Sequence, residues 1–412
     1  MDVNMEVVYE RCCGIDVHKA EIVATVITGQ HRMVTRNFGA FTEDLRDLAA
    51  WIKAEGCQMV AMESTGSYWK PLYNVFEIEG IKAMVVNSYH ARTIPGYKTD
   101  KRDSRRLAKL LRHGLLQASF IPDKDQREFR ELTRYRNSRI EERARELNRL
   151  QKMLEGANIK LGNVVSEITG DTATRLIKLA VSHESLTKEQ IAEARDPKCK
   201  ASVEEFQKAL AGIVSPLQRE LFAEVLRIID EQTRQIERIE AMIQKYTTEA
   251  YDQAAKAIDP IPGIGRISAE AIIAEIGVDM SKFPTAGHLC AWAGVAPGDN
   301  ESGGRRKSGK TRKGNRTLKK TLIQCATSAV NNKDSFACAQ YQRLVVRKGR
   351  NKAIVAVAHS LLIAIYHVLS GNDFRDLGAD YYTKFNKEKK IKSLIKQLQK
   401  LGVENPCPDL AV

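Results

Sequence analysis

The chain has 412 residues, of which 43% are hydrophobic and 28% charged, and its formal net charge is +14 at pH 7. This composition excludes an intrinsically disordered chain, and the length predicts two or three domains. The excess of Lys and Arg favours a polyanionic partner, because basic side chains displace the counterions condensed on phosphates. A basic balance alone is a weak indicator of nucleic acid, so the positions of the charges have to decide.

The cysteines and the apolar segments indicate where the protein works. The eight cysteines include no Cys-x-x-Cys pair and no histidine at zinc-ligand spacing, which predicts reduced thiols in a cytosolic protein. The N-terminus, Met1–Glu6, is acidic and lacks an apolar core, so no signal peptide is expected. The longest apolar run, Ala353–Leu369, falls short of the ~20 apolar residues that a membrane span needs. We expect a buried core helix there and no membrane partner.

Residues 11–120 have the pattern of a mixed α/β domain. The short connections between the first three strands predict antiparallel pairing. The expected elements are strands at Cys12–His18, Glu21–Thr28 and Arg32–Phe38, a helix at Glu43–Ala54, a strand at Gln58–Ser64, a helix at Trp69–Glu79, a strand at Lys82–Asn87 and a helix at Asp100–His113. This order, βββαβαβα, is that of a ribonuclease-H-like domain and differs from the alternating order of a dinucleotide-binding fold.

Residues 125–250 are helical and highly charged. A seam of apolar residues at steps of three and four predicts a coiled coil of more than three heptads, with Gln232 in its one polar slot. The seam consists of Phe222, Val225, Ile229, Ile236, Ile239, Ile243 and Tyr246. Arg127–Leu154 carries a looser version of it. The two helices could pack antiparallel within one chain or form a seam between chains, and residues 160–215 are helical without clear boundaries.

The third region runs from about Ala257 to Leu369, with helices at both ends and a Gly-rich basic loop between them. The tail, Phe385–Lys400, has an excess of Lys and predicts a solvated helix. The sequence therefore divides into an α/β domain at 1–122, a helical coiled-coil region at 123–250, a mainly helical domain at 251–372 and a basic tail at 373–412.

Four acidic residues lie where strands or strand-to-helix junctions end. Asp16 lies in the first strand, Glu63 ends an apolar strand, and Asp100 and Asp103 share one face at a helix start. Each alone has an ordinary explanation, such as a turn or an N-cap. Four such placements in one domain favour a Mg²⁺ site, in which two ions would bridge the attacking and leaving oxygens of a phosphodiester. His18, two residues after Asp16, is expected on the same face, in a structural role or beside the site.

Basic residues next to Asp100 and Asp103 would contact backbone phosphates, although a solvated charge run is the alternative. They are Lys98, Lys101, Arg102, Arg105 and Arg106. Farther along, Ile261–Ala269 has the pattern of a helix-hairpin-helix turn, in which Gly263 and Gly265 would let the backbone approach a phosphate. The alternative there is a Gly-rich connector between two helices.

The loop Pro297–Arg316 contains a serine followed by two glycines and then a dense group of cations. The serine is Ser302, and the cations are Arg305, Arg306, Lys307, Lys310, Arg312, Lys313 and Arg316. Nearby guanidinium groups would favour the alkoxide of the serine and stabilise a phosphorane-like transition state. No Ser/His/Asp order suited to acyl transfer is visible. From the residues alone, a phosphate-binding loop is favoured over a nucleophile.

Together these motifs resemble those of the "one-ten" family of bacterial insertion-sequence transposases, which are DEDD recombinases. The segments that carry the resemblance are Gly14–Lys19, Met62–Trp69, Gly96–Asp100, Leu110–Leu115, Pro262–Gly265, Ala293–Pro297 and Gly314–Arg316. They lie at both ends and represent about three-fifths of the chain. The resemblance implies a RuvC-like domain, a coiled-coil linker and a separate transposase domain.

The resemblance also implies roles for particular residues. Asp16, Glu63, Asp100 and Asp103 fall on the family's metal-binding tetrad, for Mg²⁺ or alternatively Mn²⁺. Ser302 falls on its catalytic serine, thought to link to DNA as a phosphoserine, which makes the nucleophile the favoured interpretation. Because Glu301 stands where many relatives carry a second hydroxyl, Ser308 remains a reserve nucleophile.

The implied partners are donor and target DNA, a structured noncoding guide RNA and further copies of the chain in a homodimer or tetramer. The implied location is the bacterial cytoplasm, in association with the nucleoid. We therefore expect an element-encoded recombinase that cuts and rejoins DNA with the acidic tetrad and Ser302. The alternatives are a metal-dependent junction endonuclease in which Ser302 only binds phosphate, and an architectural DNA- or RNA-binding protein with a vestigial acidic cluster.

Overall fold

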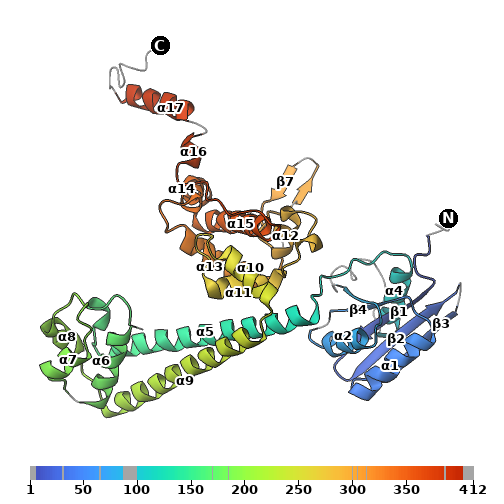
Figure 1. Cartoon of the computed structure of the whole chain (residues 1–412), viewed down its shortest axis with the longest axis horizontal. Helices are drawn as coiled ribbons and strands as arrows, with labels where there is room; N and C mark the ends of the chain where they lie inside the picture. Colours follow the sequence, from blue (N-terminus) through green and yellow to red (C-terminus); the bar gives the residue numbers. More distant parts are fainter. Residues whose placement is uncertain are drawn as a thin grey trace. The chain divides into compact units, whose positions relative to one another are not determined.

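The computed structural model describes residues 6–29, 32–64, 66–86, 100–168, 170–183, 185–298, 300–303, 305–311, 313–384 and 387–401. The chain divides into two compact units, Met1–Pro122 and Asp123–Val412. In Figure 1 the first unit is blue to teal and the second runs from teal to red. The expected mixed α/β region followed by mainly helical regions is confirmed.

The first unit is built on a five-stranded sheet with the order β3-β2-β1-β4-β5. Its elements are β1 (Arg11–Val17), β2 (Glu21–Thr28), β3 (Arg32–Gly39), α1 (Thr42–Ala54), β4 (Met59–Glu63), α2 (Trp69–Ile78), β5 (Ala83–Val86) and α4 (Asp100–Arg112). The antiparallel pairing predicted for the first three strands is confirmed, whereas β4 pairs parallel with both β1 and β5. Asn87, expected as the last residue of β5, lies outside the described residues.

Helices cover both faces of this sheet (Figure 1). Along β1, Cys13, Ile15 and Val17 point to one face, where they pack with residues of α1 and α2. Cys12 points to the other face and packs with Ala108 and other residues of α4. Because both faces are covered, β1 is buried along nearly its whole length and reads as an apolar run rather than as an alternating one.

In its described residues, the second unit is built of helices and one short hairpin. Its elements are α5 (Lys124–Gly156), η1 (Leu161–Asn163), α6 (Asp171–Ser182), α7 (Lys188–Ala194), α8 (Val203–Leu210), α9 (Pro216–Tyr246), α10 (Glu249–Ile258), α11 (Arg266–Ile276), η2 (Met280–Lys282), α12 (Ala286–Ala293), β6 (Asn300–Ser302), β7 (Arg305–Ser308), α13 (Arg316–Ala329), α14 (Phe336–Lys348), α15 (Arg350–Leu369), α16 (Tyr381–Lys384) and α17 (Lys387–Lys400). Ser215 caps α9 by accepting a hydrogen bond from the backbone N–H of Gln218.

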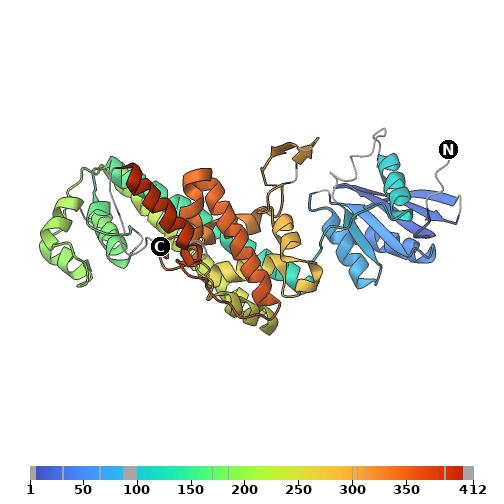
Figure 2. The ribbon, with the colours of Figure 1, turned by 90° about the horizontal axis from the view of Figure 1, so that it is seen from above.

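The two long helices α5 and α9 pack along each other in opposite directions within one chain (Figures 1 and 2). Of the two packings that the sequence left open, this structure therefore contains the intramolecular one. At one end of the pair, Leu150 and Phe222 form a core with α6, α7 and α8. At the other end, Phe129 and Ile243 belong to the core of the remaining helices.

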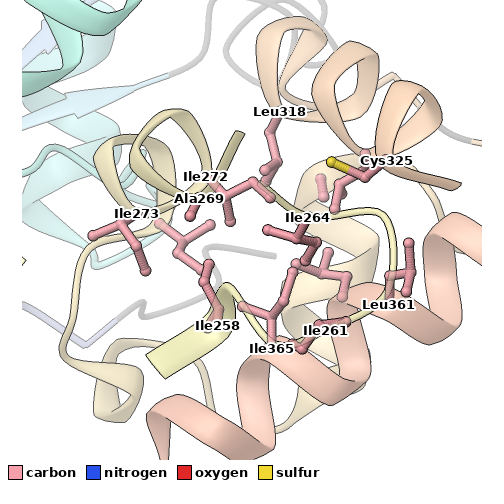
Figure 3. Close-up of a cluster of buried hydrophobic side chains, with 14 of the residues drawn as sticks. Ile258, Ile261, Ile264, Ala269, Ile272, Ile273, Leu318, Cys325, Leu361 and Ile365 are labelled. Carbon is pink, nitrogen blue, oxygen red and sulfur yellow. The ribbon is translucent and has the colours of Figure 1, made fainter. Parts of the chain in front are cut away.

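That second core is formed by α10, α11, α12, α13 and α15. Figure 3 shows Ile258, Ile261, Ile272 and Ile365 converging from three helices and the turn between α10 and α11. Among the described residues, α15 is the helix whose length and composition would allow it to cross a membrane. Its apolar side chains, such as Leu362, are buried in this core, so the predicted core helix is confirmed.

Candidate functional site

The register of two neighbouring strands brings Asp16 and Glu63 to the same edge of the sheet. Ile15 of β1 pairs with Met62 of the parallel strand β4, so the next residues along the two strands are Asp16 and Glu63. Ile15 and Met62 belong to the core under α1 and α2, and alternation along the strands turns the next residues to the opposite face. Both acids therefore lie at the carboxyl ends of adjacent parallel strands, on the face that α4 covers.

Gly14 allows α4 to approach this face closely. A Cβ atom on Gly14 would overlap the backbone nitrogen of Ala108 and the carbonyl oxygen of Ser104. The Oγ atom of Ser104 is also 2.8 Å from Oγ1 of Thr25 on β2. The helix is thus seated on the backbone of β1, with its first turn toward the strand end that carries Asp16.

The first turn of α4 carries the other two predicted acids. Asp100 is the first residue of the helix, and Asp103 is half-buried one position before the fully buried Ser104. The side chain of Asp100 lies outside the described residues. Within the described side chains, no group of three or more His, Cys, Asp and Glu could hold a metal ion. The described geometry therefore brings Asp16 and Glu63 to one strand edge and leaves the full tetrad a prediction.

Asp16 is nearly buried and is held by the neighbouring histidine. Its residue is 6% exposed, and its Oδ2 atom is 3.1 Å from Nε2 of His18, whose side chain is 44% exposed. A buried carboxylate is costly without a partner, so the imidazole contact stabilises the acid and fixes one of its oxygens. Two carboxylates on one strand edge are donors that suit a hard divalent cation, and the donor set fits Mg²⁺ or Mn²⁺.

The basic residues predicted beside the acids are only partly described. Lys98 lies outside the described residues, and Lys101 and Arg102 lie in α4 with side chains outside the description. Arg105 is exposed, and its Nε atom donates a hydrogen bond of 3.2 Å to Oγ1 of Thr35 on β3. This contact holds the Arg105 guanidinium over the sheet on the side of α4.

The glycines of the predicted helix-hairpin-helix turn have two different surroundings. Gly263 has a φ of 82°, and a Cβ atom there would overlap the carbonyl oxygen of Cys325 in α13. Its missing side chain therefore serves packing between the turn and α13. Gly265 is the N-cap of α11, and no atom lies within 4 Å of a Cβ built there. Of these two glycines, Gly265 is the one with open space beside it.

The serine loop, predicted from the sequence as a Gly-rich basic loop, contains a β-hairpin. Ser302 ends β6 and pairs with Arg305 at the start of β7, and Gly303 in the turn has a φ of 59°. Figures 1 and 2 show the hairpin projecting from the helices of its unit. The side chains of Ser302, Arg305, Arg306 and Ser308 lie outside the description, as does Arg312, whereas Lys310, Lys313 and Arg316 are exposed.

The base of this hairpin is held to the helical core. The Gly298 N–H donates to the Lys310 carbonyl at 3.1 Å, and Pro297 forms an isolated bridge with Thr311. A Cβ atom on Gly314 would overlap the backbone nitrogen of Gly294, so the returning chain lies directly on the end of α12. These contacts fix both strands of the hairpin at the point where they leave the core.

Two comparisons place these segments among known proteins. Residues 13–159, which carry Asp16, Glu63, Asp100 and Asp103, match a DEDD transposase family model of the IS110 type. Residues 255–342, which carry Ser302, match the transposase family IS116/IS110/IS902. The chain belongs to the IS110 transposase family.

Curated proteins similar to this IS110 family chain carry related names. A "Probable family 20 transposase" of Pseudomonas aeruginosa is 29% identical over 36% of this chain and 45% of its own length. The "Transposase for insertion sequence element IS1111A" of Coxiella burnetii is 28% identical over 31% of this chain and 36% of its own length. The "Insertion element IS110 uncharacterized 43.6 kDa protein" of Streptomyces coelicolor is 28% identical over 37% of this chain and 36% of its own length. The chain thus spans less than half the length of these relatives.

A buried ionic cluster in this IS110 family chain was missed by the sequence reasoning. Glu275, at 1% exposure, accepts hydrogen bonds from Arg134 Nε at 2.6 Å and Asn315 Nδ2 at 2.6 Å, and its Oε2 atom is 3.3 Å from Arg130 Nε. Burial lowers the pKa of the Arg130 guanidinium, and Glu275 acts in the opposite direction. Asn315 also caps α13, so this cluster ties α5 and α11 to the helix that follows the serine hairpin.

A second buried pair lies one turn and a half earlier on α11, where Arg136 of α5 meets Glu270. Arg136 is 2% exposed and also donates to the Ile267 carbonyl at 2.9 Å. The signal that could have revealed both clusters is the presence of Glu270 and Glu275 in the otherwise apolar helix α11. A carboxylate in an apolar run requires a buried cation, although the sequence does not say which one.

Proposed function

We propose that this protein is the DNA transposase of an insertion sequence, a recombinase that cuts and rejoins DNA strands. The observation that carries the proposal is the placement of Asp16 and Glu63 at the ends of adjacent parallel strands, inside the segment that matches the DEDD transposases. The element order βββαβαβα supports a ribonuclease-H/RuvC-like fold for the first unit. The net charge of +14 suits a nucleic-acid substrate.

Asp16, Glu63, Asp100 and Asp103 are proposed to hold Mg²⁺ or Mn²⁺. Bound there, the metal would act as a Lewis acid on phosphate oxygens and help to place the scissile strand. The residues of this chain prepare that site in three ways. The sheet fixes the spacing of Asp16 and Glu63, His18 orients the Asp16 carboxylate, and Gly14 lets α4 bring Asp103 toward the same edge.

Ser302 is proposed as the nucleophile. Its Oγ atom would form a bond to a phosphorus atom of the DNA backbone, while the bond from that phosphorus to a deoxyribose oxygen breaks. The serine hydroxyl gives up its proton, and the released sugar oxygen takes one up. A sugar hydroxyl from another strand would then attack the phosphorus of the phosphoserine. This attack would release Ser302 and restore a phosphodiester bond in the DNA. Neighbouring cations such as Arg305 and Arg306 would stabilise the charge on the phosphoryl oxygens.

The family resemblance extends the proposal to partners. We propose that donor and target DNA are chosen with a noncoding guide RNA, and that two or four copies of the chain assemble so that the serine hairpin of one completes the acidic site of another. The protein would act in the bacterial cytoplasm on nucleoid DNA. A second function is supported by the pairing of Ser302 with Arg305, which suits a phosphate clamp in a metal-dependent junction endonuclease.

Labelled DNA that spans the ends of the element, incubated with the protein and the element's RNA, separates these functions on denaturing gels. The transposase predicts a covalent protein–DNA adduct that is lost in Ser302→Ala and kept in Ser308→Ala. Asp16→Asn should lower strand cleavage at least about 100-fold, because a metal ligand is lost. Asp47→Asn, which removes an exposed acid of α1, is the matched control.

Three outcomes would contradict parts of this proposal. Cleavage without any adduct, unchanged in Ser302→Ala, would favour the endonuclease. An adduct that persists in Ser302→Ala and disappears in Ser308→Ala would move the nucleophile to Ser308. Full cleavage by Asp16→Asn would exclude both enzymes and leave an architectural nucleic-acid-binding protein.

A further inference from the structure

A groove of about 910 Å³, lined by both polar and apolar side chains, lies between α5, α11 and α13 in the second unit. All of its lining residues belong to the second unit, whereas the acidic strand edge belongs to the first. The lining includes Arg134 and Ser138 from α5, Ile267 and Ser268 from α11, and Lys319 and Lys320 from α13. The side of the groove formed by α13 follows directly from the base of the serine hairpin, because α13 begins at Arg316.

The groove has an excess of positive charge. Arg134, Arg316, Lys319 and Lys320 line it, and Glu141 is the one carboxylate among its lining residues. Glu141 pairs with Lys320 at 2.5 Å. Arg134 is also paired with the buried Glu275, so the unbalanced charge comes from Arg316 and Lys319. Arg316 is exposed and has no ion pair within the part of the chain that the structure describes. Lys319 Nζ donates to Oγ1 of Thr311 at 2.8 Å, which links the groove to the base of the hairpin.

Two helices begin at this groove. Ile267 and Ser268 lie in the first turn of α11, and Arg316 and Thr317 in the first turn of α13. Gly265, the N-cap of α11, has no side chain to accept the free N–H groups of that turn. The positive ends of both helix dipoles thus add to the side-chain charge and favour an anion.

The lining also indicates which part of a nucleic acid would fit. Besides the cations it offers hydroxyl and amide side chains, such as Asn137, Ser138 and Gln324, and it includes no aromatic residue. Proteins that bind single strands stack bases on aromatic side chains, whereas duplexes are held through phosphates by Arg, Lys and small polar groups. The chemistry therefore suits the sugar–phosphate backbone of a duplex, whose bases face inward.

We propose that this groove binds the backbone of double-stranded DNA and holds it beside the base of the serine hairpin. The proposal rests on the proposed function for its choice of DNA. It adds residues of α5 and α13, namely Arg134, Ser138, Lys319 and Lys320, to the surface that grips the substrate. The serine hairpin would then receive a duplex that is already positioned by a rigid part of its own unit.

The test measures binding of a short, labelled, mixed-sequence DNA duplex to the full chain by fluorescence anisotropy over a range of salt concentrations. The double variant Arg316→Gln/Lys320→Gln should bind the duplex more weakly. The negative slope of log K against log salt should become shallower by about 1.8, because each lost phosphate contact removes about 0.9 from its magnitude. Arg347→Gln/Lys348→Gln removes two exposed charges of α14 that do not line the groove and should leave the slope unchanged.

Glu141→Gln should change the duplex affinity in the opposite direction. Removing the carboxylate frees Lys320 and lowers the repulsion of phosphates, so binding should tighten at every salt concentration. A variant that merely damaged the fold would weaken binding instead. Binding of the matching single strand should change less than duplex binding in all groove variants.

The proposal that the groove binds DNA would be overturned if the groove variant and the α14 variant lost the same duplex affinity. Weaker duplex binding by Glu141→Gln would also overturn it, as would a larger effect of the groove variants on single strands than on duplexes. Absence of duplex binding by the unmodified chain would overturn it too. Each of these failures is distinguishable from failure of the proposed function, because strand cleavage and its loss in Asp16→Asn are measured independently.

Discussion

The acidic strand edge and the serine hairpin are stabilised by different forces. Asp16 and Glu63 are spaced by backbone pairing inside a sheet that is packed with apolar side chains on both faces. The serine hairpin has short polar strands, and near its base buried charges join α5, α11 and Asn315. Close packing holds the first arrangement, whereas buried ion pairs join the helices from which the second one projects, so different substitutions should disturb them.

The largest effect is expected for Glu275→Gln, which is nearly isosteric and removes the charge shared by Arg130 and Arg134. Removing one partner of a buried ion pair typically costs about 3–5 kcal/mol, because the remaining charge stays buried. Since Arg134 is 46% exposed, we expect about 3 kcal/mol, the lower end of that range. Urea denaturation of the full chain measures this loss.

The matched control is Glu224→Gln on the surface of α9, where Glu224 pairs with an exposed Arg227 at 2.7 Å. Both side chains are exposed, so water and salt screen the pair, and this variant should be nearly as stable as the unmodified chain. If Glu275→Gln and Glu224→Gln lost the same stability, buried ion pairs would have no special part in holding the helices near the serine hairpin, and the contrast with the acidic region would fail. It would be sharpened if Glu275→Gln also increased hydrogen exchange in the first turn of α13, where Asn315 is the cap.

A smaller effect is expected for Gly14→Ala in the acidic region. The added Cβ overlaps backbone atoms of Ser104 and Ala108. Backbone atoms cannot turn aside as a flexible side chain can, so the whole helix α4 would have to move. Overpacking of this kind costs about 1–3 kcal/mol. Because α4 must shift, cleavage should fall more than stability alone explains, and a titration of cleavage against Mg²⁺ should require more metal.

Gly29→Ala is the control for Gly14→Ala, because Gly29 has a φ of 63° and a Cβ atom added there would meet open space. Its substitution carries a conformational cost of about 1 kcal/mol without displacing α4. Gly29→Ala should therefore leave the metal requirement of cleavage unchanged. A normal metal requirement in Gly14→Ala would show that the close seating of α4 has no part in placing the acids.

The difference between the two regions also explains what the sequence could predict. In the first unit, apolar runs and short connections gave every described strand and helix to within one or two residues. The edge position of Asp16 and Glu63 followed from where those runs end. The antiparallel pairing of β1 with β2 and of β2 with β3 was predictable because short connections join segments that follow one another in the sequence.

In the second unit the same reasoning left out β6 and β7. Their residues, Asn300–Ser302 and Arg305–Ser308, are all polar, so no alternation marks them as strands. The partners of Glu275 were also out of reach, because Arg134 lies 141 positions away in the sequence. The packing role of Gly263 depends on the backbone of α13 in the same way. Such contacts exist only once the helices have assembled.

The smallest effect concerns alkaline pH and a buried thiol of the second unit. Burial raises the pKa of Cys290 from 9.0 to about 12, so the folded chain keeps this proton at pH values where the unfolded chain loses it. The contribution to stability is complete below about pH 9 and declines toward pH 12 by at most about 1.4 kcal/mol per pH unit. Cys290→Ala should therefore show a shallower loss of unfolding free energy between pH 8 and pH 10. Only the slopes are compared, because alanine also removes packing at every pH. Identical slopes in the two chains would mean that this thiol is hydrated in the folded core, which would weaken the contrast between apolar packing and buried charge in that unit.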